Sequence, residues 1–82
     1  MKDKVAVVVG GSQGLGRALA DGLIKEGAHV IIASKNKELL EETALEIAAE
    51  DHVVDVRKEQ DIRAVADFAI QEFGKIDIWV NS

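Results

Sequence analysis

The feature that most constrains this chain is an apolar run that leads directly into a glycine-rich loop. The run is Val5–Val9, the loop carries Gly10, Gly14 and Gly16, and a helical pattern begins near Leu15. This strand–turn–helix layout is typical of phosphate-binding sites, because glycine lets the backbone approach a ligand closely. The free N–H groups of the helix and its positive dipole end would face the anion. We therefore expect a nucleotide phosphate to bind at this loop.

The rest of the sequence alternates between apolar runs and helical patterns. We expect strands at residues 5–9, 29–33, 52–56 and 77–80, and helices at 14–26, 37–50 and 58–73. Apolar strands separated by helices are typical of a parallel sheet covered on both faces. Right-handed crossovers then predict an α/β fold, a partial doubly wound, Rossmann-like, three-layer parallel sheet with strand order 3-2-1-4. The ligand crevice is expected where this order reverses, at the carboxyl ends of the first and fourth strands.

The ends and inward faces of the helices also follow from the pattern. Asn36 is a suitable N-cap for the second helix, and Gly27 and Gly74 stand where the first and third helices should stop. The residues expected to face the core are Leu15, Ala18, Leu19, Leu23 and Ile24 on the first helix and Leu40, Ala44, Ile47 and Ala48 on the second.

Composition excludes several classes of protein. The chain has 82 residues, a formal net charge of −5 and no Cys. Its acidic balance argues against broad nucleic-acid binding, and no apolar run approaches the length that spans a bilayer. Without Cys there is neither a disulfide nor a thiolate metal site. We expect no metal; the lack of Cys does not determine the compartment, but it fits the cytoplasmic location that we expect.

The residues after the second predicted strand bear on cofactor choice. An acidic residue about 20 positions beyond the loop would bind the ribose hydroxyls of NAD. This chain instead has Ser34, Lys35 and Asn36 there. Ser34 can hydrogen-bond a 2′-phosphate and Lys35 can neutralise it, so NADP(H) is preferred over NAD(H), which stays possible. The alternative is that Lys35 is an ordinary solvated lysine.

Three motifs together resemble the N-terminal part of the short-chain dehydrogenases/reductases. Residues 10–16, Gly-Gly-Ser-Gln-Gly-Leu-Gly, are similar to the family's T-G-x-x-x-G-[IL]-G signature. Asp55-Val56 resembles its D-V pair, and residues 76–82 resemble its D-[IV]-L-V-N-N-A-G strand. The motifs occur in the family's order and span nearly the whole chain, so residues 1–82 are interpreted as the N-terminal, incomplete part of an NAD(P)-binding Rossmann domain.

The resemblance implies a role for each matching residue. The loop would surround the pyrophosphate and the adjacent ribose, and the residues after the second strand would contact the adenosine ribose or its 2′-phosphate. Asp55 would accept a hydrogen bond from the adenine amino group, with the Val56 backbone against the ring. Asn81 would lie beside the nicotinamide-side ribose. The implied cofactor-binding residues are Gly10, Ser12, Gln13, Gly14, Leu15, Gly16, Ser34, Lys35, Asn36, Asp55, Val56 and Asn81.

The resemblance also implies a reaction that this chain cannot complete. The family transfers a hydride between a nicotinamide and a carbonyl or alcohol carbon, using a Tyr-x-x-x-Lys pair, and the whole enzymes form homo-oligomers. This chain contains no Tyr. We therefore assign no catalytic residue and expect an inactive, truncated cofactor-binding fragment of such an oxidoreductase.

Two rival interpretations stay open. One is a standalone nucleotide-binding or regulatory module that needs no Tyr. The other is an unrelated α/β protein, such as a methyltransferase-like fold, that uses its glycine loop for another nucleoside. Asp55, Val56 and Asn81 count against the second.

Overall fold

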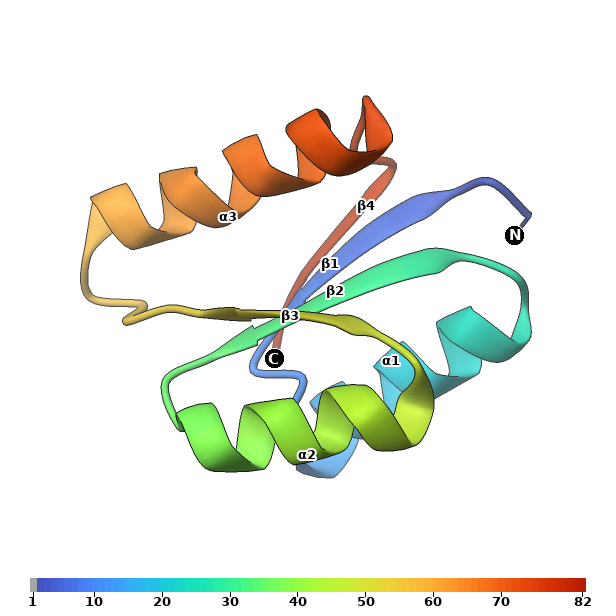
Figure 1. The fold of residues 1–82 in the computed structure, drawn as a ribbon, viewed down its shortest axis with the longest axis horizontal. Coiled ribbons are helices and arrows are strands. Elements are labelled where there is room, and N and C mark those ends of the chain that lie inside the picture. The colour runs from blue at the N-terminus through green and yellow to red at the C-terminus, as the bar shows by residue number, and fades with distance from the viewer. Residues whose placement is uncertain (1) are drawn as a thin grey trace.

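The computed structural model describes residues 2–82 and shows a four-stranded parallel sheet between two helical layers. The sheet contains β1 (Val5–Val9), β2 (His29–Ser34), β3 (Glu50–Val53) and β4 (Ile78–Asn81). The helices are α1 (Gly14–Lys25), α2 (Lys37–Ile47) and α3 (Glu59–Phe73). Helices α1 and α2 cover one face of the sheet and α3 covers the other (Figure 1).

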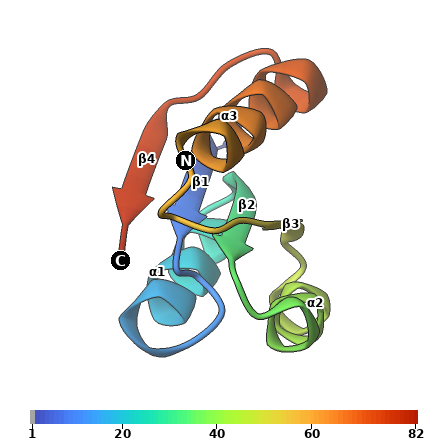
Figure 2. The ribbon, with the colours of Figure 1, turned by 90° about the vertical axis from the view of Figure 1, so that its left-hand side faces the viewer.

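The strand order is β3-β2-β1-β4, as the sequence predicted. Each neighbouring pair is parallel, and β1 lies between β2 and β4, with Val9 opposite both Ala33 and Asn81. Figure 2 shows β4 at the outer edge of the sheet, with the C-terminus beyond its arrowhead. The carboxyl ends of β1, β2 and β4 therefore meet at one edge, which is where a doubly wound sheet binds its ligand.

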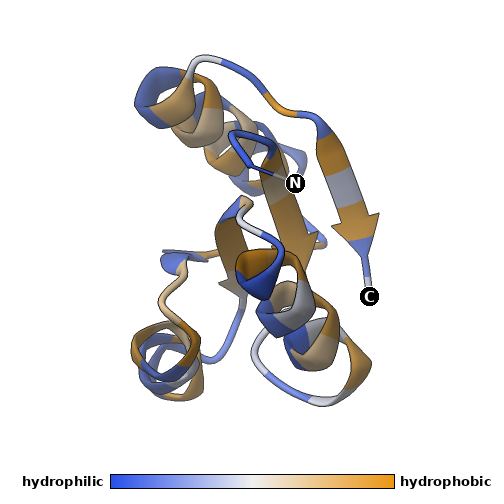
Figure 3. Cartoon of the chain, turned by 90° about the vertical axis from the view of Figure 1, so that its right-hand side faces the viewer, coloured by the Kyte–Doolittle hydropathy of each residue, from blue (hydrophilic) through white to orange (hydrophobic). Residues whose placement is uncertain are grey.

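The core divides into two apolar clusters, one on each face of the sheet. Alternate residues of β1 point to opposite faces, so Ala6 and Val8 pack toward α1 and α2, whereas Val7 and Val9 pack toward α3. All five residues of β1 are buried. Colouring by hydropathy shows apolar central strands between helices that mix polar and apolar residues (Figure 3).

Three predicted boundaries are wrong in the same region, one of them the end of β3, which lies at Val53 and not at residue 56. Helix α2 ends at Ile47 instead of continuing to residue 50, because Ala48 adopts a left-handed conformation with φ of 64°. The turn is short, so β3 begins at Glu50 and pairs with Ile31, ahead of the predicted start at residue 52. Ala48 is consequently exposed and does not belong to the core face.

The predicted inward face of α1 also needs correction. The buried residues of this helix are Gly16, Ala20 and Leu23. Leu15 is 87% exposed and Leu19 is 41% exposed. The apolar stripe is wider than the surface that the sheet covers, and of the buried residues of α1, Ala20 and Leu23 belong to the core cluster.

Candidate functional site

The glycine loop turns at the carboxyl end of β1. Gly10 has φ of 87°, a conformation that glycine adopts without the steric cost borne by other residues. Its N–H donates to the Ala33 carbonyl of β2 at 2.6 Å. The first residue of the loop is therefore fixed across the sheet edge, and the backbone bends toward α1 from a defined point.

The first turn of α1 packs directly against this loop. A Cβ on Gly16 would collide with the Gly10 carbonyl group and would lie 3.0 Å from the Ser82 Oγ. Ser82 follows β4, and its N–H donates to the Val9 carbonyl at 2.9 Å. The loop, the helix and the end of β4 thus converge, and only glycine at position 16 permits that spacing.

The other side of the loop is held by α2. Ser12 is 5% exposed, and its carbonyl accepts a buried hydrogen bond of 2.9 Å from the Thr43 hydroxyl. Arg17 of α1 also forms an ion pair of 2.6 Å with Glu46 of α2. Contacts with α2 therefore anchor one side of the loop, while the loop residue Gln13 is exposed.

The segment after β2 presents polar side chains to the same edge. Asn36 caps α2 through its Oδ1, which accepts from the Leu39 N–H at 3.1 Å. Lys35 is exposed, and the Ser34 hydroxyl is buried without a hydrogen-bond partner among the described residues. An unpartnered buried hydroxyl costs free energy unless a ligand or water satisfies it.

Asp55 lies beyond β3, where the chain turns toward α3. Arg57 holds its carboxylate on both oxygens, with Nε at 3.0 Å from Oδ1 and Nη2 at 2.9 Å from Oδ2. The Arg57 backbone N–H also donates to Oδ1 at 3.0 Å. These hydrogen bonds, first of all those from the Arg57 side chain, keep the pKa of Asp55 well below its usual range. The carboxylate therefore stays ionised at neutral pH.

Two connected hollows open between these segments and share Gly10, Ser34, Lys35 and Ser82. One, the β3 hollow, has a volume of about 400 Å³. The other, the loop hollow, has a volume of about 450 Å³. The β3 hollow adds Val9, Val54, Asp55, Val56 and Arg57, and the loop hollow adds Ser12, Gln13, Asn36 and Leu39. The β3 hollow is mostly apolar with charged residues at its rim, and the loop hollow is polar where it follows the glycine loop.

Eight of the twelve residues implied by the sequence line these hollows, and four do not. Gly14 and Leu15 lie at the exposed start of α1, and Gly16 is buried behind the loop. Asn81 ends β4, where its Oδ1 accepts from the Trp79 indole N–H at 3.2 Å. Of these four residues, Gly16 is the one that packs against the hollow-lining Gly10 and Ser82.

The sequence interpretation missed two residues that shape the site. It gave Arg57 no role, although an Arg two positions after an Asp can reach back to the carboxylate. It did not single out Thr43, whose hydroxyl is buried at 0% exposure. A Thr on the inward face of an otherwise apolar helix was the available signal, since a buried hydroxyl needs a partner.

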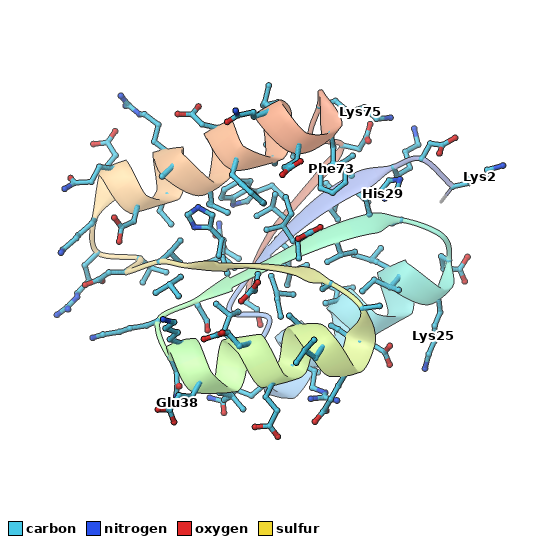
Figure 4. The ribbon with its side chains drawn as sticks, in the orientation of Figure 1. Lys2, Lys25, His29, Glu38, Phe73 and Lys75 are labelled. Carbon is cyan, nitrogen blue, oxygen red and sulfur yellow. The ribbon has the colours of Figure 1, made fainter. Side chains whose placement is uncertain are left out.

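His29 lies away from the loop, at the start of β2. Figure 4 shows His29 beside Phe73 at the end of the sheet where the strands begin, and their rings stack with centroids 5.0 Å apart. Within residues 2–82 no cluster of His, Cys, Asp and Glu could hold a metal ion. None of the helices in this part of the chain is long and apolar enough to cross a membrane.

Comparisons with known proteins agree with this geometry. A family model described as short chain dehydrogenase matches residues 4–82. The oxidoreductase YxnA of Bacillus subtilis, itself uncharacterized, is 38% identical over the whole chain, which covers 24% of its length.

Two solved structures are also similar. L-sorbose reductase from Gluconobacter frateurii, complexed with NADPH and L-sorbose, has a TM-score of 0.95 and 34% identity over 100% of this chain and 34% of its own. The 3-ketoacyl-(acyl-carrier-protein) reductase from Brucella melitensis, complexed with NADH, has a TM-score of 0.90 and 38% identity over 95% of this chain and 33% of its own.

Proposed function

Because the chain belongs to the short-chain dehydrogenase family, we propose that its two hollows hold the adenosine and pyrophosphate half of a nicotinamide dinucleotide. The observation that carries the proposal is the meeting of the two hollows at the carboxyl ends of the strands. One hollow is apolar with a carboxylate at its rim, which suits an aromatic base. The other follows a glycine loop and a helix N-terminus, which suit phosphate groups.

The twelve implied residues divide between the parts of the cofactor. The loop residues, from Gly10 to Gly16, would approach the pyrophosphate with their backbone N–H groups. Ser34 would complete its hydrogen bonding with the adenosine ribose or its 2′-phosphate, beside Lys35 and Asn36. Asp55 and Val56 would meet the adenine, and Asn81 would lie toward the nicotinamide.

We propose that NADP(H) binds more tightly than NAD(H). Lys35 is exposed, lines both hollows and can approach a 2′-phosphate. No acidic residue stands at positions 34–36, where a carboxylate would repel that phosphate. Relatives of known structure include complexes with either cofactor, so the preference rests on these side chains.

The reaction proposed for the whole protein is hydride transfer between the nicotinamide and a carbonyl or alcohol carbon. The chain spans about a quarter to a third of the length of its relatives, so it is proposed as the N-terminal part of their cofactor-binding domain. It has no Tyr to serve as the family's acid and base. We therefore expect binding without turnover, which is also what a nucleotide-binding module without catalysis would show.

Calorimetry with NADPH and NADH tests the cofactor proposal. Lys35→Glu should weaken NADPH binding by roughly tenfold or more, since attraction to the 2′-phosphate becomes repulsion, and should change NADH binding much less. Lys2→Glu is the matched control, because Lys2 lies at the opposite end of the strands (Figure 4). Equal weakening of both cofactors would mean that Lys35 does not contact the 2′-phosphate. Absence of binding to the folded wild-type chain would refute the proposed function.

A further inference from the structure

We propose that Arg57 is a positioning residue for base recognition, holding the Asp55 carboxylate so that one acceptor site faces an adenine amino group. The inference rests on the proposed function, because it takes the β3 hollow as the binding place of the base. It adds a residue to which neither the family motifs nor the sequence pattern gave a role.

Arg57 occupies most of the hydrogen-bond acceptor sites of the Asp55 carboxylate. An ionised carboxylate has about four acceptor sites, two on each oxygen. Oδ1 of Asp55 accepts from both the Arg57 backbone N–H and Nε, each at 3.0 Å, so its sites are filled. Among residues 2–82, Oδ2 accepts only from Nη2, at 2.9 Å. One site on Oδ2 is therefore free to accept a single N–H from a ligand.

The geometry also fixes the direction of that free site. A guanidinium that binds both oxygens of a carboxylate constrains its rotation, because two parallel hydrogen bonds define its plane. The Asp55 backbone is fixed as well, since its N–H donates to Asp61 Oδ2 at 2.9 Å. The Asp55 side chain is only 17% exposed, so few other orientations are open to it.

The surroundings suit a planar base with an amino group. The apolar side chains Val9, Val54 and Val56 line the β3 hollow, and Asp55 and Arg57 share it with them. An apolar slot favours an aromatic ring, and a carboxylate at its side favours a donor on the ring edge. Adenine offers an amino donor, whereas hypoxanthine offers an oxygen at the same place and would be repelled.

Two charged groups lower the pKa of the Asp55 carboxyl: Arg57, which contacts it directly, and Lys35, which lines the same hollow, whereas burial raises that pKa. The Asp61 carboxylate lies nearby and accepts the Asp55 backbone N–H. Because Arg57 lowers the pKa of Asp55 most, removing it should return the pKa toward its ordinary value near 3.9. The acceptor would then be lost by protonation at mildly acidic pH, where the wild-type acceptor persists.

Binding of NAD⁺ and its hypoxanthine analogue to Arg57→Ala and Arg57→Lys chains tests the proposal. We expect Arg57→Ala to weaken NAD⁺ about tenfold at pH 7, the effect of one displaced charge-assisted hydrogen bond, and the analogue less than about twofold. The affinity of Arg57→Lys for NAD⁺ should lie between those of the wild type and Arg57→Ala, since a lysine keeps the charge but cannot make the bidentate contact. Below pH 5, NAD⁺ binding by Arg57→Ala should weaken further relative to the wild type. The ¹³C chemical shift of the Asp55 carboxyl should titrate at a higher pH in Arg57→Ala than in the wild type.

Arg63→Ala is the matched control. It removes the same side chain from an exposed ion pair with Glu59, on α3 and outside both hollows. The proposal is overturned if Arg57→Ala binds both dinucleotides as the wild type does, or if it binds NAD⁺ more tightly. It is also overturned if the loss appears only with NADP⁺, which would make Arg57 a ligand of the 2′-phosphate. Wild-type binding of neither dinucleotide would instead refute the proposed function itself.

Discussion

Replacing two glycines of α1 by alanine, one packed against the loop and one unobstructed, tests how closely the loop and the helix pack. Gly16 and Gly22 both lie inside this helix. Replacing a helical Gly by Ala stabilises the helix by about 1 kcal/mol when nothing obstructs the new methyl group. A Cβ on Gly22 would have no atom within 4 Å outside its own helix, so Gly22→Ala should gain that amount.

Gly16→Ala should lose stability instead. The new methyl group would collide with the Gly10 carbonyl group, which cannot easily retreat because the Gly10 N–H is bonded to Ala33 at 2.6 Å. Overpacking of this kind costs about 1–3 kcal/mol or more, which outweighs the gain in helix propensity. Because both variants gain the same helix propensity, they should differ in their free energy of unfolding by the overpacking cost, about 1–3 kcal/mol or more.

Equilibrium urea unfolding of the two variants and the wild type measures this difference. A loss confined to Gly16→Ala, together with weaker dinucleotide binding, is the expected result, since the collision pushes the loop away from α1. If Gly16→Ala proves as stable as Gly22→Ala, the close contact between loop and helix does not exist as described, and the reasoning fails.

Two further variants probe the supports of the site and of the sheet. Thr43→Val leaves the buried Ser12 carbonyl unpaired and should cost about 1–3 kcal/mol in urea unfolding. Thr43→Ser keeps the hydroxyl and should retain that contribution, so equal losses would assign the effect to packing alone. Asp77 Oδ2 accepts from the Val5 N–H at 2.8 Å, and this bond lowers the pKa of Asp77. The ionised Asp77 stabilises the fold at pH values above the pKa of an unfolded Asp, near 3.9, and this stabilisation is lost as the pH falls from there through the lower pKa of the folded state. Asp77→Asn should therefore lose less stability than the wild type between pH 5 and 3, and parallel acid curves would contradict this.

The sequence predicted the centre of the sheet well because the strands there are marked by apolar residues, whereas β3 begins two residues before its predicted start. Val5–Val9 is uniformly apolar, and its bounds are confirmed. The strand order followed from crossover handedness and is also confirmed. Ala48 shows the limit of this approach: its left-handed conformation ends α2, yet alanine favours helix and gives no stop signal.

Side-chain partners were harder to predict than elements. Leu15 and Leu19 fit a helical period, but the pattern does not reveal how much of a helix the sheet covers. The contact between Arg57 and Asp55 depends on a turn that brings the side chains together. The role of Thr43 depends on which loop passes over α2. Each is a property of three-dimensional packing between segments.

The convergence of Gly10, Gly16 and Ser82 has a consequence for the order of folding. The chain between β1 and β4 contains the other two strands and all three helices, and the Val5–Asp77 bond joins residues 72 positions apart. Pairing over such a separation closes a long loop, and its entropic cost delays it relative to local contacts. We therefore expect β1, β2 and their helices to associate first and β4 to dock late. Since Ser82 lines both hollows, the proposed cofactor site would be completed only in that final step.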